Sequence, residues 1–215
     1  MSHRKLIPIV EGHGEASCVR ELVRRYLRQR EVFDVLVESP INTKGASKLK
    51  ATYSRQKRLG VEYWVKMAHG KRPDGILVLL DADKECLDRT RERRPGLGPE
   101  LAGRARKAAG KIPVEVVVAN RQYEAWLVAG WDTIRNEVLL ANPDAITSEN
   151  MRTAEAAHGW VGKLGQALGR GYKKTTDQRS LSRYLPFHGE ILANAPSFAR
   201  FLRCVDRLVE AMRGE

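Results

Sequence analysis

The sequence predicts an α/β fold with a mostly parallel sheet, helices on both faces of the sheet, and a helical C-terminal part. Short apolar runs alternate with amphipathic stretches over the first 130 residues, which is typical of a parallel sheet covered on both sides. From Trp131 onward the pattern is helical and no strong strand follows. We therefore expect an α/β domain over residues 1–130 and a helical extension over residues 131–215 that packs on it.

The strands and helices of the α/β part are predicted from apolar periodicity and from glycine and proline breaks. The expected strands are Leu6–Val10, Val32–Glu38, Ile76–Leu80 and "IPVEVVVAN" at 112–120. The expected helices are Ala16–Arg30, Lys48–His69, Glu100–Gly110 and Arg121–Gly130, with a short helix and loop in Lys84–Arg94 and a loop at "SPINTKGAS".

The helical extension is predicted from the same periodicity. Its helices are expected at Trp131–Leu140, Ser148–Leu168 and Ser197–Met212. Before the last of them, "YLPFHGEILANAP" is expected to be an irregular connection with about one helical turn.

Composition narrows the class of protein. The 215 residues carry a formal net charge of +12 at pH 7, mostly through arginine, and 42% are hydrophobic. An arginine-rich surface attracts polyanions, which favours a nucleic-acid partner, although a solvated arginine-rich surface is the alternative. No apolar run suits a membrane helix or a secretory signal, so we expect a cytoplasmic protein without membrane contact. The three cysteines contain no C-x-x-C pair, which argues against a zinc site.

Acidic residues follow three of the predicted strands. Glu11 ends the first strand and Glu15 begins the next helix, Asp81 and Asp83 follow the third strand in "LLDADKE", and Glu124 follows the fourth. The carboxyl ends of parallel strands share one edge of a sheet, where ligands bind. Clustered carboxylates repel one another unless cations neutralise them, and oxygen ligands suit Mg²⁺ or Mn²⁺. The sequence therefore predicts a divalent-metal site.

Each acid also has an ordinary structural interpretation. Asp83 could cap a following helix, Glu15 could interact with a helix dipole, and Glu124 could lie on the surface. His13, between two glycines, could be a base or a metal ligand, and an exposed loop residue is the simpler interpretation. The segment "EGHGEAS" lacks the spacing and lysine of a phosphate-binding loop. No third glycine completes a dinucleotide motif, and no G-x-S-x-G motif of serine hydrolases occurs.

The order of these acids resembles the Toprim domain of topoisomerases, bacterial primases, the maturation nuclease of 5S ribosomal RNA and the overcoming-lysogenization-defect (OLD) nucleases. A glutamate after the first strand in "VEGHGE" and an Asp-x-Asp after a later strand in "LLDAD" carry the resemblance, which spans about Leu6–Ala129. "IVEGHGEASCVRELVRRYL", "YEAWLVAG" and "YKKTTDQRSLSRYL…APSFARFLRCVDRL" resemble a family of small prokaryotic Toprim-like proteins over nearly the whole chain.

The resemblance implies roles for the acids. Glu11 matches the Toprim glutamate, a general acid/base or metal ligand, and Asp81 and Asp83 match the metal-binding aspartates. Glu15 resembles an additional acid of the OLD-type nucleases, which implies a second metal ion. Glu124 has no counterpart in the minimal motif, and strand geometry and the narrower family pattern suggest that it belongs to the catalytic group.

Basic residues are the expected contacts to a nucleic-acid backbone. A lysine in the C-terminal half assists catalysis in OLD-type nucleases, and Lys173 or Lys174 could take that place without a local motif to identify it. The predicted nucleic-acid-binding residues are Arg20, Arg24, Arg25, Lys48, Lys50, Arg55, Lys57, Arg58, Arg170, Lys173, Lys174 and Arg179.

These observations together predict a Mg²⁺- or Mn²⁺-dependent nuclease acting on DNA or RNA, with prokaryotic defence as one setting. The first alternative is a non-catalytic Toprim-like subunit that binds nucleic acid within a larger complex, since one fold hosts many functions. A phosphotransferase or phosphatase acting on a small substrate is a third interpretation, which the large basic surface disfavours. A protein partner or a homo-oligomer is compatible with each of them.

Overall fold

The computed structural model describes residues 3–83 and 96–214. The helix and loop expected within Lys84–Arg94 therefore lie outside the described residues. None of the described helices combines the length and the apolar character needed to cross a bilayer.

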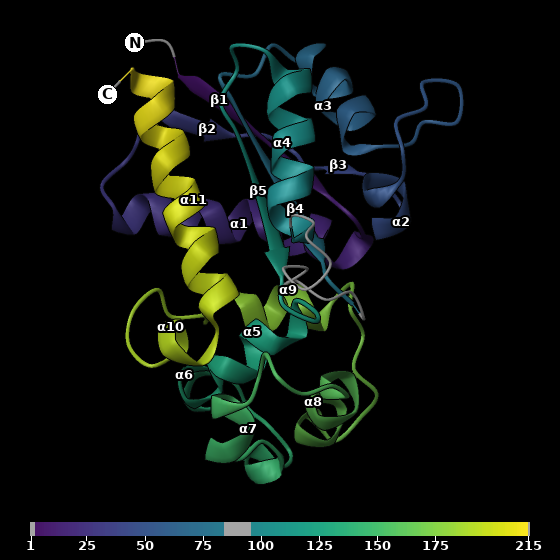
Figure 1. Ribbon diagram of the computed structural model, residues 1–215. Coiled ribbons are helices and arrows are strands. Elements are labelled where there is room, and N and C mark those ends of the chain that lie inside the picture. The colour runs from purple at the N-terminus through teal and green to yellow at the C-terminus, as the bar shows by residue number, and fades with distance from the viewer. Residues whose placement is uncertain (1–2, 84–95, 215) are drawn as a thin grey trace.

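The centre of the fold is a parallel sheet (Figure 1). Its order is β2-β1-β4-β5, and β3 also pairs with β1. All of these pairings are parallel, which confirms the predicted fold class. The strands are β1 (Arg4–Val10), β2 (Val35–Val37), β3 (Ile41–Asn42), β4 (Gly75–Asp81) and β5 (Val114–Ala119).

Helices connect the strands and form the C-terminal part. Those of the α/β part are α1 (His13–Gln29), α2 (Ala46–Lys50), α3 (Val61–His69), α4 (Leu97–Ala109) and α5 (Glu124–Ala129). Those that follow are α6 (Trp131–Glu137), the 3₁₀ turn η2 (Pro143–Ala145), α7 (Ser148–Arg152), α8 (Trp160–Leu168), α9 (Asp177–Ser182), α10 (Ile191–Asn194) and α11 (Pro196–Arg213).

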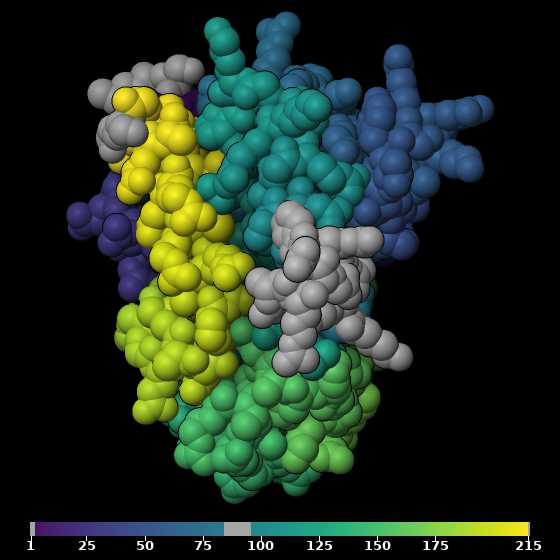
Figure 2. Space-filling model, in the orientation of Figure 1, coloured from purple at the N-terminus to yellow at the C-terminus, as the bar shows by residue number. Residues whose placement is uncertain are grey.

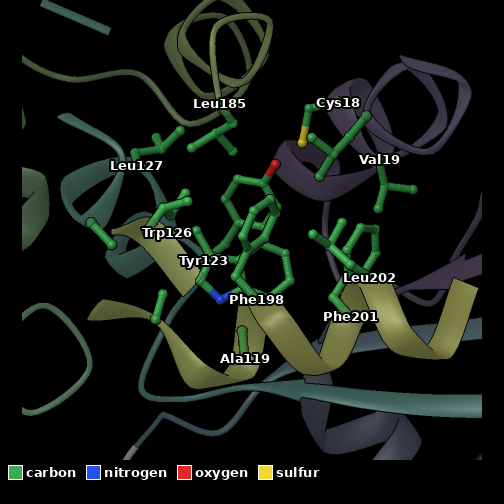
Figure 3. Close-up of a cluster of buried hydrophobic side chains, with 14 of the residues drawn as sticks. Cys18, Val19, Ala119, Tyr123, Trp126, Leu127, Leu185, Phe198, Phe201 and Leu202 are labelled. Carbon is green, nitrogen blue, oxygen red and sulfur yellow. The ribbon is translucent and has the colours of Figure 1, made fainter. Parts of the chain in front are cut away.

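Alternation along the strands divides the apolar side chains between two cores, as a sheet covered on both faces requires. Leu77 and Leu79 of β4 pack with α1, α5 and α11, and we name this side the α1 face. Ile76 and Val78 pack with α3 and α4, and we name this side the α3–α4 face. Figure 3 shows aromatic side chains of the α1 face, with Trp126 and Phe198 close together.

The C-terminal helices share the core of the α1 face. Phe201 and Val205 of α11 are fully buried among residues of α1, β4 and α5, and α11 runs along the sheet in Figure 1. Helices α6 to α8 gather beyond the carboxyl end of β5 in the same view. The extension therefore packs on the sheet, and the expected boundary at residue 130 stays a prediction.

The sequence predictions of two long helices are wrong, because each segment contains two shorter helices. The segment expected to be one helix over Lys48–His69 contains α2, a turn and α3, and Gly60 has a positive φ of 88° just before α3. The segment expected over Ser148–Leu168 is divided into α7 and α8, with Gly159 at a φ of 85° before α8. Both glycines have a positive φ, which the interior of an α-helix does not contain, so neither predicted helix can run through its glycine.

Smaller differences concern short elements. The strand expected over Val32–Glu38 is reduced to β2, and β3 lies in the segment expected to be a loop. No apolar periodicity predicts α9, because its six residues are mostly polar. The remaining predicted strands and helices occur with shifts of a few residues at their ends.

Candidate metal centre

The acids predicted at the strand ends meet at one edge of the sheet. Val10 and Leu79 are register partners in β1 and β4, so the residues that follow these strands emerge side by side. Ligand oxygens of Glu11, Glu15 and Asp81 all lie within 4.8 Å of one another. Glu15 belongs to this group because α1 begins at His13 and carries it in its first turn. The predicted convergence of these three acids is therefore present.

Hydrogen bonds fix each carboxylate of the three. The backbone N–H of Asp81 donates to Oε2 of Glu11 at 2.9 Å. Oδ1 of Asp81 accepts the backbone N–H of Tyr123 at 2.8 Å, and Oε1 of Glu15 accepts Nε2 of Gln178 at 3.2 Å. The side chains are thus oriented by β4, the start of α5 and α9, which pre-organises the group.

Glu124 lies beside this group and is fully buried. Among residues 3–83 and 96–214, neither of its carboxylate oxygens has a hydrogen-bond partner, although Nζ of Lys174 lies 3.5 Å from Oε1. A buried carboxylate with unused oxygens is costly unless a cation compensates it. Lys174 supplies one positive charge, and the oxygens retain capacity for another ligand.

Burial raises the pKa of these acids. It raises the pKa of Glu11 from 4.5 to about 7, with further repulsion from Glu15 and Asp83. Burial, followed by repulsion from Glu11 and Glu15, also holds the pKa of Asp81 well above its ordinary value. The pKa of Glu124 is raised by burial against the attraction of Lys174. Burial would lower the pKa of Lys174, but the surrounding carboxylates outweigh it and the pKa is raised.

This environment fits a divalent cation. Three buried or half-buried carboxylates supply hard oxygen ligands, and their mutual repulsion is the kind that a bound cation removes. Within the described part of the chain, the Glu124 oxygens have no hydrogen-bond partner, so their lone pairs are free to accept from a further ligand. The group of three is consistent with a divalent-metal site.

Asp83 lies apart from the group of three. Its side chain is 61% exposed, and Oδ2 is 3.6 Å from Nζ of Lys50. The chain turns at Asp83, which has a φ of 55°, while the Ala82 N–H remains bonded to Ala119. Asp83 stays a predicted ligand, and a rotation of its exposed side chain would be needed to join the others. His13 is exposed as the simpler interpretation expects, but it is the first residue of α1 and not a loop residue.

The basic side chains predicted to contact nucleic acid differ in their exposure and in the hydrogen bonds and ion pairs that they form within the protein. Nε of Arg20 donates to the carbonyl of Val37 at 2.9 Å, and Arg25 donates to the carbonyls of Ser182 and Leu185. Other members of the set lie at the surface, and every member stays a prediction. Arg24 forms an ion pair with Glu21, and Arg170 forms one with Asp177. Lys48 and Lys50 are half-buried. The exposed members are Arg55, Lys57, Arg58, Lys173, Lys174 and Arg179.

Gln178 and Thr43 were not singled out from the sequence. Gln178 is fully buried and bonds Glu15, and buried Thr43 donates its hydroxyl to the Glu11 carbonyl at 3.5 Å. A glutamine or threonine in a polar loop carries no metal signal of its own. For Gln178 the available signal was its position within "YKKTTDQRSLSRYL", and for Thr43 there was none.

Comparison with known proteins agrees with this geometry. A family model described as "Domain of unknown function (DUF4276)" matches residues 10–206. In structure, the chain is similar to the C-terminal region of the Burkholderia pseudomallei OLD protein, with a TM-score of 0.51, 14% identity, and coverage of 99% of this chain and 100% of that one. At 14% identity this similarity shows that the two chains share a fold.

A weaker similarity was found to the C-terminal region of the Xanthomonas campestris pv. campestris OLD protein phased with platinum. Its TM-score is 0.45 at 16% identity, and the match covers 98% of this chain and 94% of that one. No curated protein matches the chain.

Proposed function

This chain belongs to the DUF4276 family, and we propose that it is a divalent-metal-dependent nuclease that hydrolyses phosphodiester bonds in DNA or RNA. The observation that carries the proposal is the group of Glu11, Glu15 and Asp81, whose ligand oxygens lie within 4.8 Å of one another. The OLD-like fold and the net charge of +12 support it. Carboxylates gathered in a basic protein suit the handling of a polyanion through a cation.

The three acids would hold Mg²⁺ or Mn²⁺, and the exposed Asp83 would join them by rotating its side chain. A bound cation would lower the pKa of a water molecule and neutralise charge on the phosphodiester. Burial raises the pKa of Glu11 to about 7 without metal, and a bound cation would hold its carboxylate deprotonated as a ligand. Lys174, next to Glu124, would place a positive charge close to the scissile phosphate.

One observation favours the non-catalytic alternative. Asp83, the second aspartate of "LLDAD", is turned toward Lys50 rather than toward the other acids. A protein that has kept the Toprim scaffold only to bind nucleic acid would tolerate such an arrangement. Salt-dependent binding without turnover under any metal would support this alternative.

Incubation with single-stranded, duplex and nicked DNA and with RNA, in Mg²⁺ or Mn²⁺, tests the proposal. We expect cleavage by the wild type and a loss of about 100-fold or more in Glu11→Gln and Asp81→Asn, because each removes charge that holds the cation. Glu137→Gln on the exposed surface of α6 is the matched control. Cleavage that persists in Glu11→Gln and Asp81→Asn would refute the site assignment.

A further inference from the structure

We propose that the turn between α2 and α3, residues 51–60, and the pocket beside it bind a single-stranded segment of nucleic acid. We name residues 51–60 the basic turn. The choice of nucleic acid as ligand rests on the proposed function. Figure 1 shows this turn projecting from the molecule beyond α2, and Figure 2 shows its side chains reaching outward.

The basic turn has a fixed backbone. Ser54 and Leu59 exchange two backbone hydrogen bonds, of 3.0 and 2.9 Å, and the Gly60 N–H donates to the carbonyl of Lys48 at 2.8 Å. A Cβ at Gly60 would approach Cα of Tyr53 to 2.7 Å, so only glycine permits this closure. A turn fixed in this way presents its side chains with little further loss of entropy on binding.

The tip of the turn carries three exposed cations. Arg55, Lys57 and Arg58 are exposed, and no acidic side chain within residues 3–83 and 96–214 forms an ion pair with them. Arg20 and Arg25, by contrast, are bonded to backbone carbonyls elsewhere in the fold. As far as the described residues go, the three cations of the turn are therefore available for phosphates.

The pocket beside the turn contains two aromatic rings. Tyr53, Arg55, Tyr63, Lys66 and Met67 line a cavity of about 440 Å³. Nζ of Lys66 lies 4.7 Å from the centroid of the Tyr53 ring. The ring of Tyr63 is held edge-to-face against Trp64 at 5.1 Å. Aromatic rings flanked by cations are the means by which proteins stack unpaired bases and hold the adjoining phosphates. A duplex keeps its bases stacked internally, so the pocket favours a single strand.

The turn is connected to the acidic group by a short path. The Gly45 N–H donates to the carbonyl of Glu11 at 2.6 Å, and α2 then leads from Gly45 to the turn. At its end, Nζ of Lys50 is 3.4 Å from the carbonyl of Ala82. Because the five residues of α2 rise only about 8 Å, a strand held at the acids could continue onto the basic turn.

Fluorescence anisotropy with dye-labelled oligonucleotides in EDTA tests the proposal on the full chain. We expect the triple variant Arg55→Ala, Lys57→Ala, Arg58→Ala to bind single-stranded DNA and RNA roughly tenfold or more weakly at 0.1 M salt, with a salt slope smaller by about 2. We expect Tyr53→Ala to weaken single-strand binding by about fivefold or more and to leave duplex binding unchanged, since stacking is lost.

A matched control removes three exposed arginines elsewhere, by Arg28→Ala, Arg183→Ala and Arg203→Ala. Single-strand affinity in the first triple equal to that of this control would overturn the proposal. So would an unchanged affinity in Tyr53→Ala, or competition by polyglutamate as strong as that by an oligonucleotide. Binding in EDTA requires no cleavage, so a wild type that binds but never cleaves would refute the nuclease activity and leave this site in place.

Discussion

The two faces of the sheet handle their carboxylates in opposite ways. On the α1 face, Asp81 and Glu124 are buried, and burial raises the pKa of both. On the α3–α4 face, Glu62 receives hydrogen bonds of 2.8 and 2.9 Å from Arg104. Burial would raise the pKa of Glu62, but the hydrogen-bonded Arg104 guanidinium outweighs burial and the pKa is lowered.

The difference separates a structural ion pair from a group of acids that repel one another. A carboxylate that already has a guanidinium partner needs no further cation, whereas a group of mutually repelling acids does. The two faces also differ in the size of their apolar cores, and the core of the α1 face is the larger. The α1 face is covered by α1, α5 and the C-terminal helices, while the described helices that cover the α3–α4 face are α2, α3 and α4.

The largest expected effect concerns the core of the α1 face. Trp126 packs against Phe198 and Phe201 at ring-centroid distances of 5.2 and 5.3 Å, and its Nε1 donates to the hydroxyl of Ser197. We expect Trp126→Ala to lower the free energy of unfolding by about 3–5 kcal/mol. Urea denaturation followed by both circular dichroism and fluorescence measures it.

The matched change on the α3–α4 face is Leu101→Ala, at a fully buried residue of α4, with an expected loss of about 2–4 kcal/mol. Because α11 shares its core with α1, we expect the two probes to give one coincident transition in each protein. An earlier separate transition of the C-terminal helices would contradict the shared core and would support an independent extension.

An intermediate effect is expected from pH in the metal-free protein. Glu11 has a pKa of about 7 in the folded state against an ordinary 4.5, so the folded state binds the proton more tightly. The stability contributed by this proton is present below pH 4.5 and is lost as pH rises toward 7. Relative to wild type, Glu11→Gln should therefore be more stable at pH 8 than at pH 5 by about 1–3 kcal/mol, measured by urea titration.

Glu62 should respond with the opposite sign. Its lowered pKa means that its stabilisation is present above the ordinary value of 4.5 and is lost as pH falls through the lowered pKa. Glu62→Gln should destabilise the protein at pH 8 by up to about 1 kcal/mol and have no effect in strong acid. If the stability of Glu11→Gln and of Glu62→Gln relative to wild type changed with pH in the same direction, the predicted difference between the two carboxylates would be contradicted.

The smallest expected effect compares one substitution on the two faces. A Cβ at Gly14 would lie 2.0 Å from Oε1 of Gln178, so Gly14→Ala must displace the amide that bonds Glu15, and we expect a loss of about 1 kcal/mol. A Cβ at Gly103 in α4 would meet nothing within 4 Å, so Gly103→Ala should add about 0.5–1 kcal/mol. Thermal denaturation of both variants checks the sign, and a gain in Gly14→Ala would contradict the close contact.

Apolar runs and glycines in the sequence were sufficient to predict the long strands of the sheet but not β3 or the short helices. The strand runs that became β1, β4 and β5 are continuous and buried, so periodicity identifies them. The helix expected over Lys48–His69 failed because its basic residues suit either a helix surface or a turn. The turn forms because the backbone of Gly60 passes close to Tyr53. Local apolar periodicity does not reveal this contact.

Topology explains how much of the candidate site could be predicted. Glu11 and Asp81 follow neighbouring parallel strands, so the sequence alone brings them to one edge. The orientation of Asp83 depends on a positive φ and on Lys50, and the contribution of Gln178 depends on α9 packing against α1. Such side-chain orientations arise from long-range contacts and carry no periodic signal.

The closed base of the basic turn has a consequence for evolutionary change. Because Ser54 and Leu59 are joined across it and Gly60 is tied to Lys48, insertions or deletions at the tip would leave the flanking helices in register. Related chains can therefore acquire longer, shorter or differently charged tips while the sheet and the acids stay unchanged. The length and charge of the turn are thus free to change independently of the acids at the edge of the sheet.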